Sequence, residues 1–137
     1  MTIARKRASR RGASLVEFAF TLPIILLIFF GFIELARANM IRNSAKNAAY
    51  MGARRAVIPG GTAAEAEQKA RDVLGATGVR NANVTVQPSV VTDQTPQITV
   101  SVSVSFAENS WVIPEFLMDS TLSQDCTLTR ESSDSGF

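Results

Sequence analysis

The sequence has no histidine and only one cysteine, Cys126, among its 137 residues. One cysteine cannot form an intramolecular disulfide, and the lack of histidine excludes a His/Cys zinc site and catalysis of the Ser-His-Asp or Cys-His type. A glycine-rich phosphate loop is also missing, since the pair Gly60-Gly61 follows a proline and is typical of a turn. These absences argue against an enzyme, a bound metal, a cofactor and a small-molecule substrate.

Charge is scarce and unevenly distributed along the chain. The formal net charge is +2, whereas the first twelve residues carry +5 and no acid, so residues 13–137 carry −3. The five cations of this basic leader are Arg5, Lys6, Arg7, Arg10 and Arg11. Beyond the leader the linear sequence has no basic patch with interleaved aromatic residues, and this argues against binding to nucleic acid.

A long apolar run follows the leader and contains one acid near its start. No residue from Phe18 to Ile33 is charged, and with residues 13–16 the apolar stretch reaches about 20 residues, which matches the hydrocarbon core of a bilayer. Glu17 lies at the beginning of this run, five residues after Gly12. A carboxylate inside a membrane-length apolar segment is costly, so it indicates a functional position. The excess of cations before the run predicts a cytoplasmic N-terminus and an extracytoplasmic remainder.

Two other interpretations of this segment stay open. An ordinary membrane anchor can carry an acid at its border. A secretory signal peptide is the second, because Ala36-Arg37-Ala38 resembles a cleavage site before Asn39. The length of the apolar run and the charges at Glu17, Glu34 and Arg37 argue against the signal peptide.

The helix is expected to continue from the membrane to about residue 58, where Pro59-Gly60-Gly61 ends it. Small residues recur at helical spacing along this part and form one broad face, with the basic and amide side chains largely off it. The face can be covered by the chain's own sheet or packed against helices of other subunits, and both can hold along different parts of it. Its members are Ala45, Ala48, Ala49, Gly52, Ala53 and Ala56.

The remaining residues predict a second short helix and three strands. Thr62 and Glu65 form a capping box that opens a helix expected to stop at Gly75. Alternation of apolar and polar residues then predicts strands around residues 84–86, at 97–106 and at 121–130. The parity of the last strand makes Cys126 a small core residue. The predicted fold is α+β: a long N-terminal membrane-spanning helix, with a small antiparallel sheet packed on its periplasmic half.

At this point the residues carry a family resemblance. R-R-G-A-S-L-V-E-F-A-F-T-L-P-I-I-L-L-I-F-F-G-F-I-E, residues 10–34, resembles the N-terminus of TadE-like proteins, pseudopilins of the bacterial tight-adherence (Flp-type) pilus system. The resemblance implies a type IV pilin-like fold, inner-membrane insertion and a minor structural role in pilus assembly and cell adhesion. It also implies cleavage by a prepilin peptidase between Gly12 and Ala13, after which Glu17 is the fifth residue and Phe18 fills the adjacent aromatic position.

Two functions from different classes follow. The first is an assembly subunit whose partners are membrane lipid, the prepilin peptidase and other pilin-like subunits. The second is a single-pass anchor with an extracytoplasmic binding domain that enters no filament. The expected organisation is a leader at 1–12, a transmembrane segment at 13–34, a pilin-like domain at 35–131 and a polar tail at 132–137.

Overall fold

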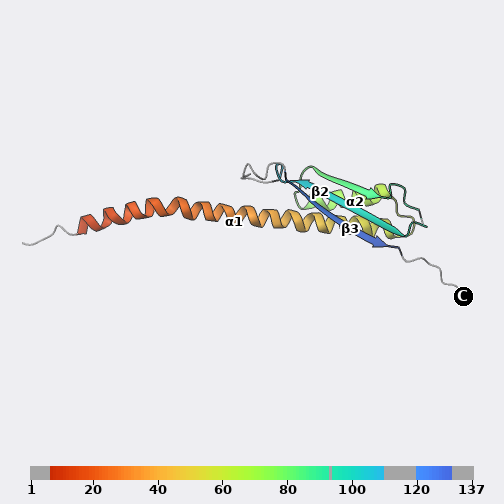
Figure 1. Cartoon of the computed structure of the whole chain (residues 1–137), viewed down its shortest axis with the longest axis horizontal. Helices are drawn as coiled ribbons and strands as arrows, with labels where there is room; N and C mark the ends of the chain where they lie inside the picture. Colours follow the sequence, from red (N-terminus) through yellow and green to blue (C-terminus); the bar gives the residue numbers. More distant parts are fainter. Residues whose placement is uncertain (1–6, 93, 110–119, 131–137) are drawn as a thin grey trace, which may run out of the picture. The chain divides into compact units, whose positions relative to one another are not determined.

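The computed structural model describes residues 7–92, 94–109 and 120–130, with side chains from residue 12 onward. The elements are α1 (Arg7–Val57), α2 (Ala63–Ala76), β1 (Ala82–Gln87), β2 (Gln97–Ser105) and β3 (Thr121–Thr129) (Figure 1). The chain divides into two compact units, Met1–Ala36 and Arg37–Phe137. A long apolar helix followed by a small antiparallel sheet confirms the predicted α+β class.

Helix α1 is longer than predicted at its start and ends one residue earlier than expected. It begins at Arg7, inside the segment predicted to be a leader, because no proline separates that segment from the apolar run. At the other end Gly60 adopts φ +76°, a left-handed conformation that suits glycine. Gly61 packs so closely that an added Cβ would lie 2.5 Å from the carbonyl oxygen of Arg55. The Pro-Gly-Gly turn therefore ends the helix as predicted, and Gly61 allows the following chain to approach its last carbonyls.

Helix α2 begins with the predicted capping box. The backbone N–H of Glu65 donates to Thr62 Oγ1, and Glu65 Oε2 accepts from the backbone N–H of Thr62, both at 3.2 Å. Contrary to expectation, the helix does not stop at Gly75 but continues to Ala76, with Thr77 as its C-cap. Gly75 lacks the positive φ of a glycine C-cap, whereas Gly78 has φ +71° and provides the turn three residues later.

The sheet has the order β1-β2-β3, and both neighbouring pairs are antiparallel. Val100 at the centre of β2 lies opposite Val86 of β1 and Cys126 of β3. The apolar side chains of β2 are buried as the alternation predicted, although β2 ends at Ser105 and Phe106 lies beyond it. The predicted connection with Trp111, Pro114 and Phe116 falls outside the described residues, as does the tail.

One face of this sheet builds the core of the second unit. Apolar side chains from α1, α2 and all three strands form one cluster on that face, with Cys126 among the partly buried members. Burial raises the pKa of the Cys126 thiol, so it stays protonated near neutral pH. On the opposite face the strands present hydroxyl and amide side chains, and Thr99 and Thr127 share a hydrogen bond of 2.8 Å between strands β2 and β3. The sheet thus has one face packed on the core and one face in contact with solvent.

A buried asparagine joins three parts of the second unit. Asn109 is 2% exposed, and its amide donates to the carbonyl oxygens of Arg80 at 2.8 Å and Ser105 at 3.0 Å. Its Oδ1 accepts from the backbone N–H of Arg80 at 2.7 Å, and its own carbonyl accepts a short hydrogen bond from Nε of Arg37 on α1. Every polar atom of a buried amide needs a partner, and here two of the three partner residues, Arg80 and Arg37, lie 29 and 72 residues away in the sequence.

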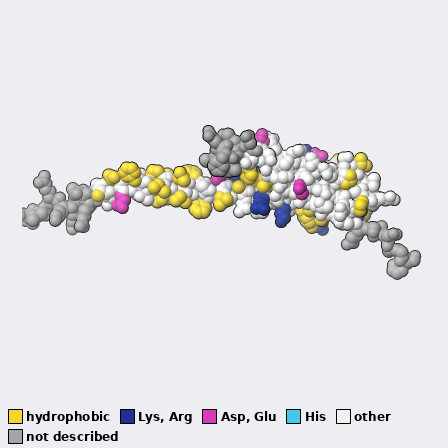
Figure 2. Space-filling model, in the orientation of Figure 1, with side chains coloured by type: hydrophobic (Ala, Val, Ile, Leu, Met, Phe, Trp, Pro, Cys, Tyr) yellow, Lys and Arg dark blue, Asp and Glu magenta, His cyan; other side chains and the backbone are white. Residues whose placement is uncertain are grey.

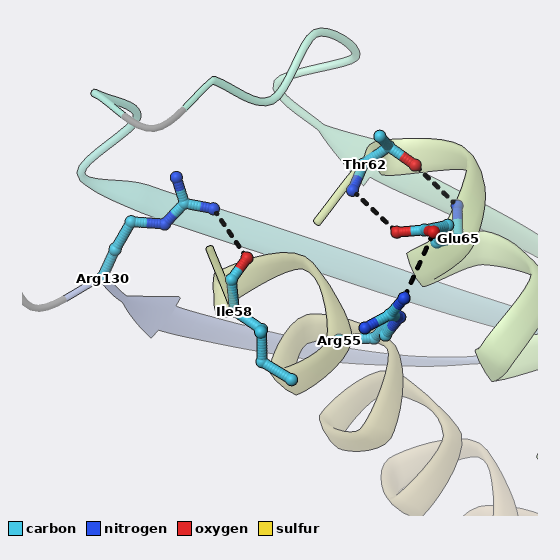
Figure 3. A network of polar contacts seen from close by, with 5 residues as sticks. All are labelled: Arg55, Ile58, Thr62, Glu65 and Arg130. Atoms are coloured by element: carbon cyan, nitrogen blue, oxygen red, sulfur yellow. Dashed lines mark hydrogen bonds and ion pairs between the residues drawn. The ribbon is translucent and has the colours of Figure 1, made fainter. Parts of the chain in front are cut away.

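An arginine just after β3 caps the end of α1 (Figure 3). The guanidinium of Arg130 donates to the carbonyl oxygens of Ala56 at 2.7 Å, Val57 at 3.0 Å and Ile58 at 3.5 Å. It also donates to the carbonyl oxygen of Thr92 at 2.7 Å. The last carbonyls of a helix lack partners within the helix and carry partial negative charge, so a cation there supplies both hydrogen bonds and favourable electrostatics.

Candidate membrane and assembly site

The first unit exposes an apolar helical surface that has no cover within the chain. The large hydrophobic side chains from Leu15 to Ile33 are each between 38% and 75% exposed. Figure 2 shows apolar side chains spread over the visible face of this part of α1. Among the described residues, α1 is the one helix long and apolar enough to cross a membrane, and none of its most apolar window is buried. A core helix of a soluble domain would be covered, so this surface requires lipid or other helices.

The predicted cleavage site lies inside α1 rather than ahead of it. Gly12 is exposed, and an added Cβ would meet no atom within 4 Å. The first turn of α1 contains no acidic residue, and cations near a helix N-terminus oppose the helix dipole. A glycine at this point also lowers the helical preference of the chain. These features weaken the helix around Gly12 and Ala13.

Glu17 and Phe18 follow on the same exposed helix, and Phe18 is 60% exposed. The Glu17 carboxylate makes no ion pair with any residue that the structure describes, while its backbone carbonyl accepts a hydrogen bond of 2.8 Å from the Thr21 hydroxyl. Pro23 lies inside the helix and provides no N–H for the carbonyl of Ala19. An acid at the start of an apolar helix is costly in a membrane.

The small-residue face of α1 is buried within the second unit. Its alanines are fully buried, and an added Cβ on Gly52 would lie 2.9 Å from the carbonyl oxygen of Ala66 and 3.2 Å from the Cβ of Ala70. The face therefore packs against α2 and the sheet of its own chain, the first of the two alternatives that the sequence left open. The six residues concerned are Ala45, Ala48, Ala49, Gly52, Ala53 and Ala56.

Sequence reasoning missed the polar contacts that hold the second unit together. Asn109 and Arg130 mostly bind backbone atoms, and Arg130 reaches carbonyls 72 to 74 residues away. No local spacing signals such contacts, because any residue can offer the carbonyl. Only the positive charge of Arg130 near a strand end hinted at a helix C-terminal partner.

A family model described as TadE-like protein matches residues 12–54. This segment of the chain is similar to TadE-like proteins. The match begins at Gly12 and runs through the apolar segment and most of the small-residue face, so the resemblance first inferred from residues 10–34 is confirmed. TadE-like proteins are structural and associated with tight-adherence pili. No curated protein and no solved structure matches the chain significantly.

Proposed function

We propose that this TadE-like protein is a minor pseudopilin, processed after Gly12 and assembled through its N-terminal helix. The observation that carries the proposal is the uncovered apolar surface of α1 with one acid, Glu17, five residues after Gly12. A soluble domain would not leave such a surface open, and a plain anchor has no need of an acid there. The family match supports a role with the pilus rather than catalysis.

The chemistry of processing follows from the residues at the site. Hydrolysis of the peptide bond between Gly12 and Ala13 adds one water, leaves a carboxylate on Gly12 and frees an ammonium group on Ala13. Residues four apart on a helix are neighbours on its surface, so the new ammonium lies within reach of the Glu17 carboxylate of the same chain. It can equally meet Glu17 of an adjacent subunit. Burying such a pair costs desolvation, so its value is to fix the register of packing rather than to add stability.

The proposed location is the bacterial inner membrane, crossed once. The five cations of the leader favour a cytoplasmic N-terminus, and the second unit would then be extracytoplasmic. In this arrangement the peptidase acts at the cytoplasmic border of the membrane, where Gly12 lies. Phe18 and the following apolar side chains would contact lipid before assembly and neighbouring helices after it.

The first test is the N-terminus of the protein purified from its native membrane, determined by intact mass. We expect the chain to start at Ala13 in the wild type and at Met1 or Thr2 after Gly12→Val. An unprocessed wild-type chain would leave a plain membrane anchor. A start at Asn39 would mean a secreted protein and would reject the proposal.

The second test separates the role of Glu17 from processing. Glu17→Ala is expected to be cleaved after Gly12 but to be at least about tenfold depleted from the sheared filament fraction, since the ammonium loses its partner. Glu34→Ala removes the acid at the other border of the apolar run and is the matched control. Equal incorporation of both variants would contradict a pairing role for Glu17.

A further inference from the structure

The helices of the second unit form a layer that is wider than the sheet covering it. Two helices packed side by side span roughly 18–20 Å, whereas three strands span roughly 14 Å. Helices α1 and α2 both pack on one face of the sheet, and α2 lies against β1 at one edge. The opposite edge is β3, so α1 is the helix that lies nearest to it (Figure 1). About one strand's width of the helix layer therefore extends past the sheet.

The burial of side chains locates the uncovered position at β3. The apolar side chains of β2 are at most 1% exposed, and Val84 at the centre of β1 is 4% exposed. Every inward side chain of β3, by contrast, is only partly buried, including Leu122, Cys126 and Leu128. A groove of about 350 Å³ lies between β3 and α1. Its lining residues are Asn43, Lys46, Asn47 and Tyr50 from α1 and Asp125 and Cys126 from β3.

The edge of β3 is also open to backbone pairing. Every second residue of an edge strand turns its N–H and C=O away from the neighbouring strand, which makes the edge a template for a further strand. Strand β3 keeps nine residues in unbroken register with β2 and contains neither proline nor lysine, residues that commonly protect an edge. The other edge strand, β1, has only six residues. The fold thus leaves space, core surface and backbone groups for one more strand beside β3.

The groove carries a positive charge that its own walls do not neutralise. Lys46 is exposed and forms no ion pair with any residue that the structure describes. Asp125 lies opposite Ser101 of β2 and is exposed on the solvent face of the sheet, so its carboxylate points away from the groove. Tyr50 is 44% exposed and lies four residues after Lys46, which is about 6 Å further along the helix. A cation and an aromatic ring are therefore aligned along the groove.

We infer that the edge of β3 and this groove bind an extended segment of a different pilin-like subunit, which adds a fourth strand to the sheet. Successive side chains on one face of a strand are about 6.5–7 Å apart, close to the spacing between Lys46 and Tyr50. The segment therefore presents an acidic side chain to Lys46 and an apolar one, two residues away, to Tyr50. Backbone hydrogen bonds provide affinity in this mode of binding, and the alternate side chains provide selectivity.

The strands that the structure describes do not have this pattern themselves. Strands β1 and β2 contain no acid, and Asp125 of β3 has Ser123 and Thr127 two positions away, neither of them apolar. The segment is therefore assigned to a different subunit rather than to a described strand of a second copy. That the partner is a subunit rests on the proposed function, whereas the chemistry of the segment rests on the groove alone.

The test uses the full chain in micelles of a neutral detergent and two fluorescent peptides. The first is Thr-Val-Thr-Glu-Thr-Val-Thr, in which the acid has a valine two residues away on each side and so suits either strand direction. The second has lysine in place of the glutamate. Fluorescence anisotropy compares the wild type with Lys46→Glu and with Lys69→Glu, since Lys69 is exposed on α2 and does not line the groove. Thermal unfolding checks that both variants remain folded.

We expect the wild type and Lys69→Glu to bind the acidic peptide at least about threefold more tightly than the basic one, and Lys46→Glu to reverse this preference. Hydrogen exchange should slow at the backbone amides of β3, but not of β1, when the acidic peptide binds to the wild type. Three results would overturn the inference: no binding of the acidic peptide up to about 1 mM, an unchanged preference in Lys46→Glu, or binding without protection of β3.

Two further outcomes would assign the edge to a different occupant. Exchange in β3 that becomes faster on dilution of the chain alone would mean that a second copy already pairs with this edge. Tighter peptide binding after removal of residues 131–137 would mean that the chain's own last residues compete for it. Either result overturns the inference but leaves the proposed function intact, because processing at Gly12 is measured separately by intact mass.

Discussion

Arg130 shows how much of this small domain depends on a single side chain. It lies at the end of β3, and its guanidinium supplies donors to three carbonyls at the end of α1. Arg130→Met keeps the apolar stem but removes these donors, so we expect the free energy of unfolding to fall by about 2 kcal/mol. Thermal unfolding of the full chain in detergent micelles, followed by near-ultraviolet circular dichroism, measures the change.

A matched arginine provides the control for this substitution. Arg80 is exposed, and only its backbone takes part in the hydrogen bonds to Asn109. Arg80→Met should therefore change stability by no more than about 0.5 kcal/mol. Arg130→Lys keeps the charge but loses the planar fork, and an intermediate loss is expected. If Arg130→Met were as stable as Arg80→Met, the cap would contribute nothing measurable.

At the residue scale the sequence predicted what local patterns can encode. The capping box of Thr62 and Glu65 and the inward parity of Cys126 depend on spacings of a few residues, and both are confirmed. The contacts of Asn109 and Arg130 could not be predicted, because most of their partners are backbone atoms of segments far along the chain. The roles proposed for Gly12, Ala13 and Glu17 remain predictions, since they depend on a peptidase and on other subunits.

At the scale of elements, the contact between α1 and α2 is closer than side chains normally allow. An added Cβ at Gly52 would approach the carbonyl oxygen of Ala66 to 2.9 Å, so Gly52→Ala forces the helices apart. We expect a loss of about 1–3 kcal/mol from overpacking, which outweighs the gain of about 1 kcal/mol in helix propensity. Urea unfolding of the full chain in micelles tests this.

Gly75 in α2 provides the opposite expectation from the same substitution. An added Cβ there would meet no atom within 4 Å, and the residue has no positive φ. Gly75→Ala should raise stability by up to about 1 kcal/mol, because only the propensity gain remains. Two changes of the same sign and size would show that helix propensity, and not the close contact at Gly52, governs both positions.

Element boundaries were predictable where the sequence contains a breaker and wrong where it does not. Pro59-Gly60-Gly61 marked the end of α1, but nothing before Gly12 marks its beginning, and the helix starts at Arg7. The pattern predicts a stop at Gly75, but a glycine at the end of a helix usually adopts the left-handed conformation, which Gly78 does instead. Whether a glycine does so depends on the chain that follows.

On the scale of the whole molecule, the two units differ in how they treat apolar surface. Fourteen large hydrophobic side chains from Leu15 to Ile33 are exposed, whereas among the described residues of the second unit the exposed ones are scattered: Met40, Tyr50, Ile58 and Val90. The second unit thus buries its own core, and the first relies on its surroundings. We expect a fragment of residues 37–137 to be soluble, monomeric and cooperatively folded without detergent, while the full chain requires detergent or lipid.

The boundary of this fragment is set by contacts at the start of the second unit. Arg37 donates to the carbonyl of Asn109, and Ile41 is the first buried apolar residue of α1. A fragment starting at Ala45 loses both and should unfold at a clearly lower urea concentration, since a small core tolerates little loss. Sedimentation velocity and far-ultraviolet circular dichroism compare the two fragments. Aggregation of the longer fragment at micromolar concentration, with the full chain folded in micelles, would show that the domain depends on its membrane segment and is not an independent folding unit.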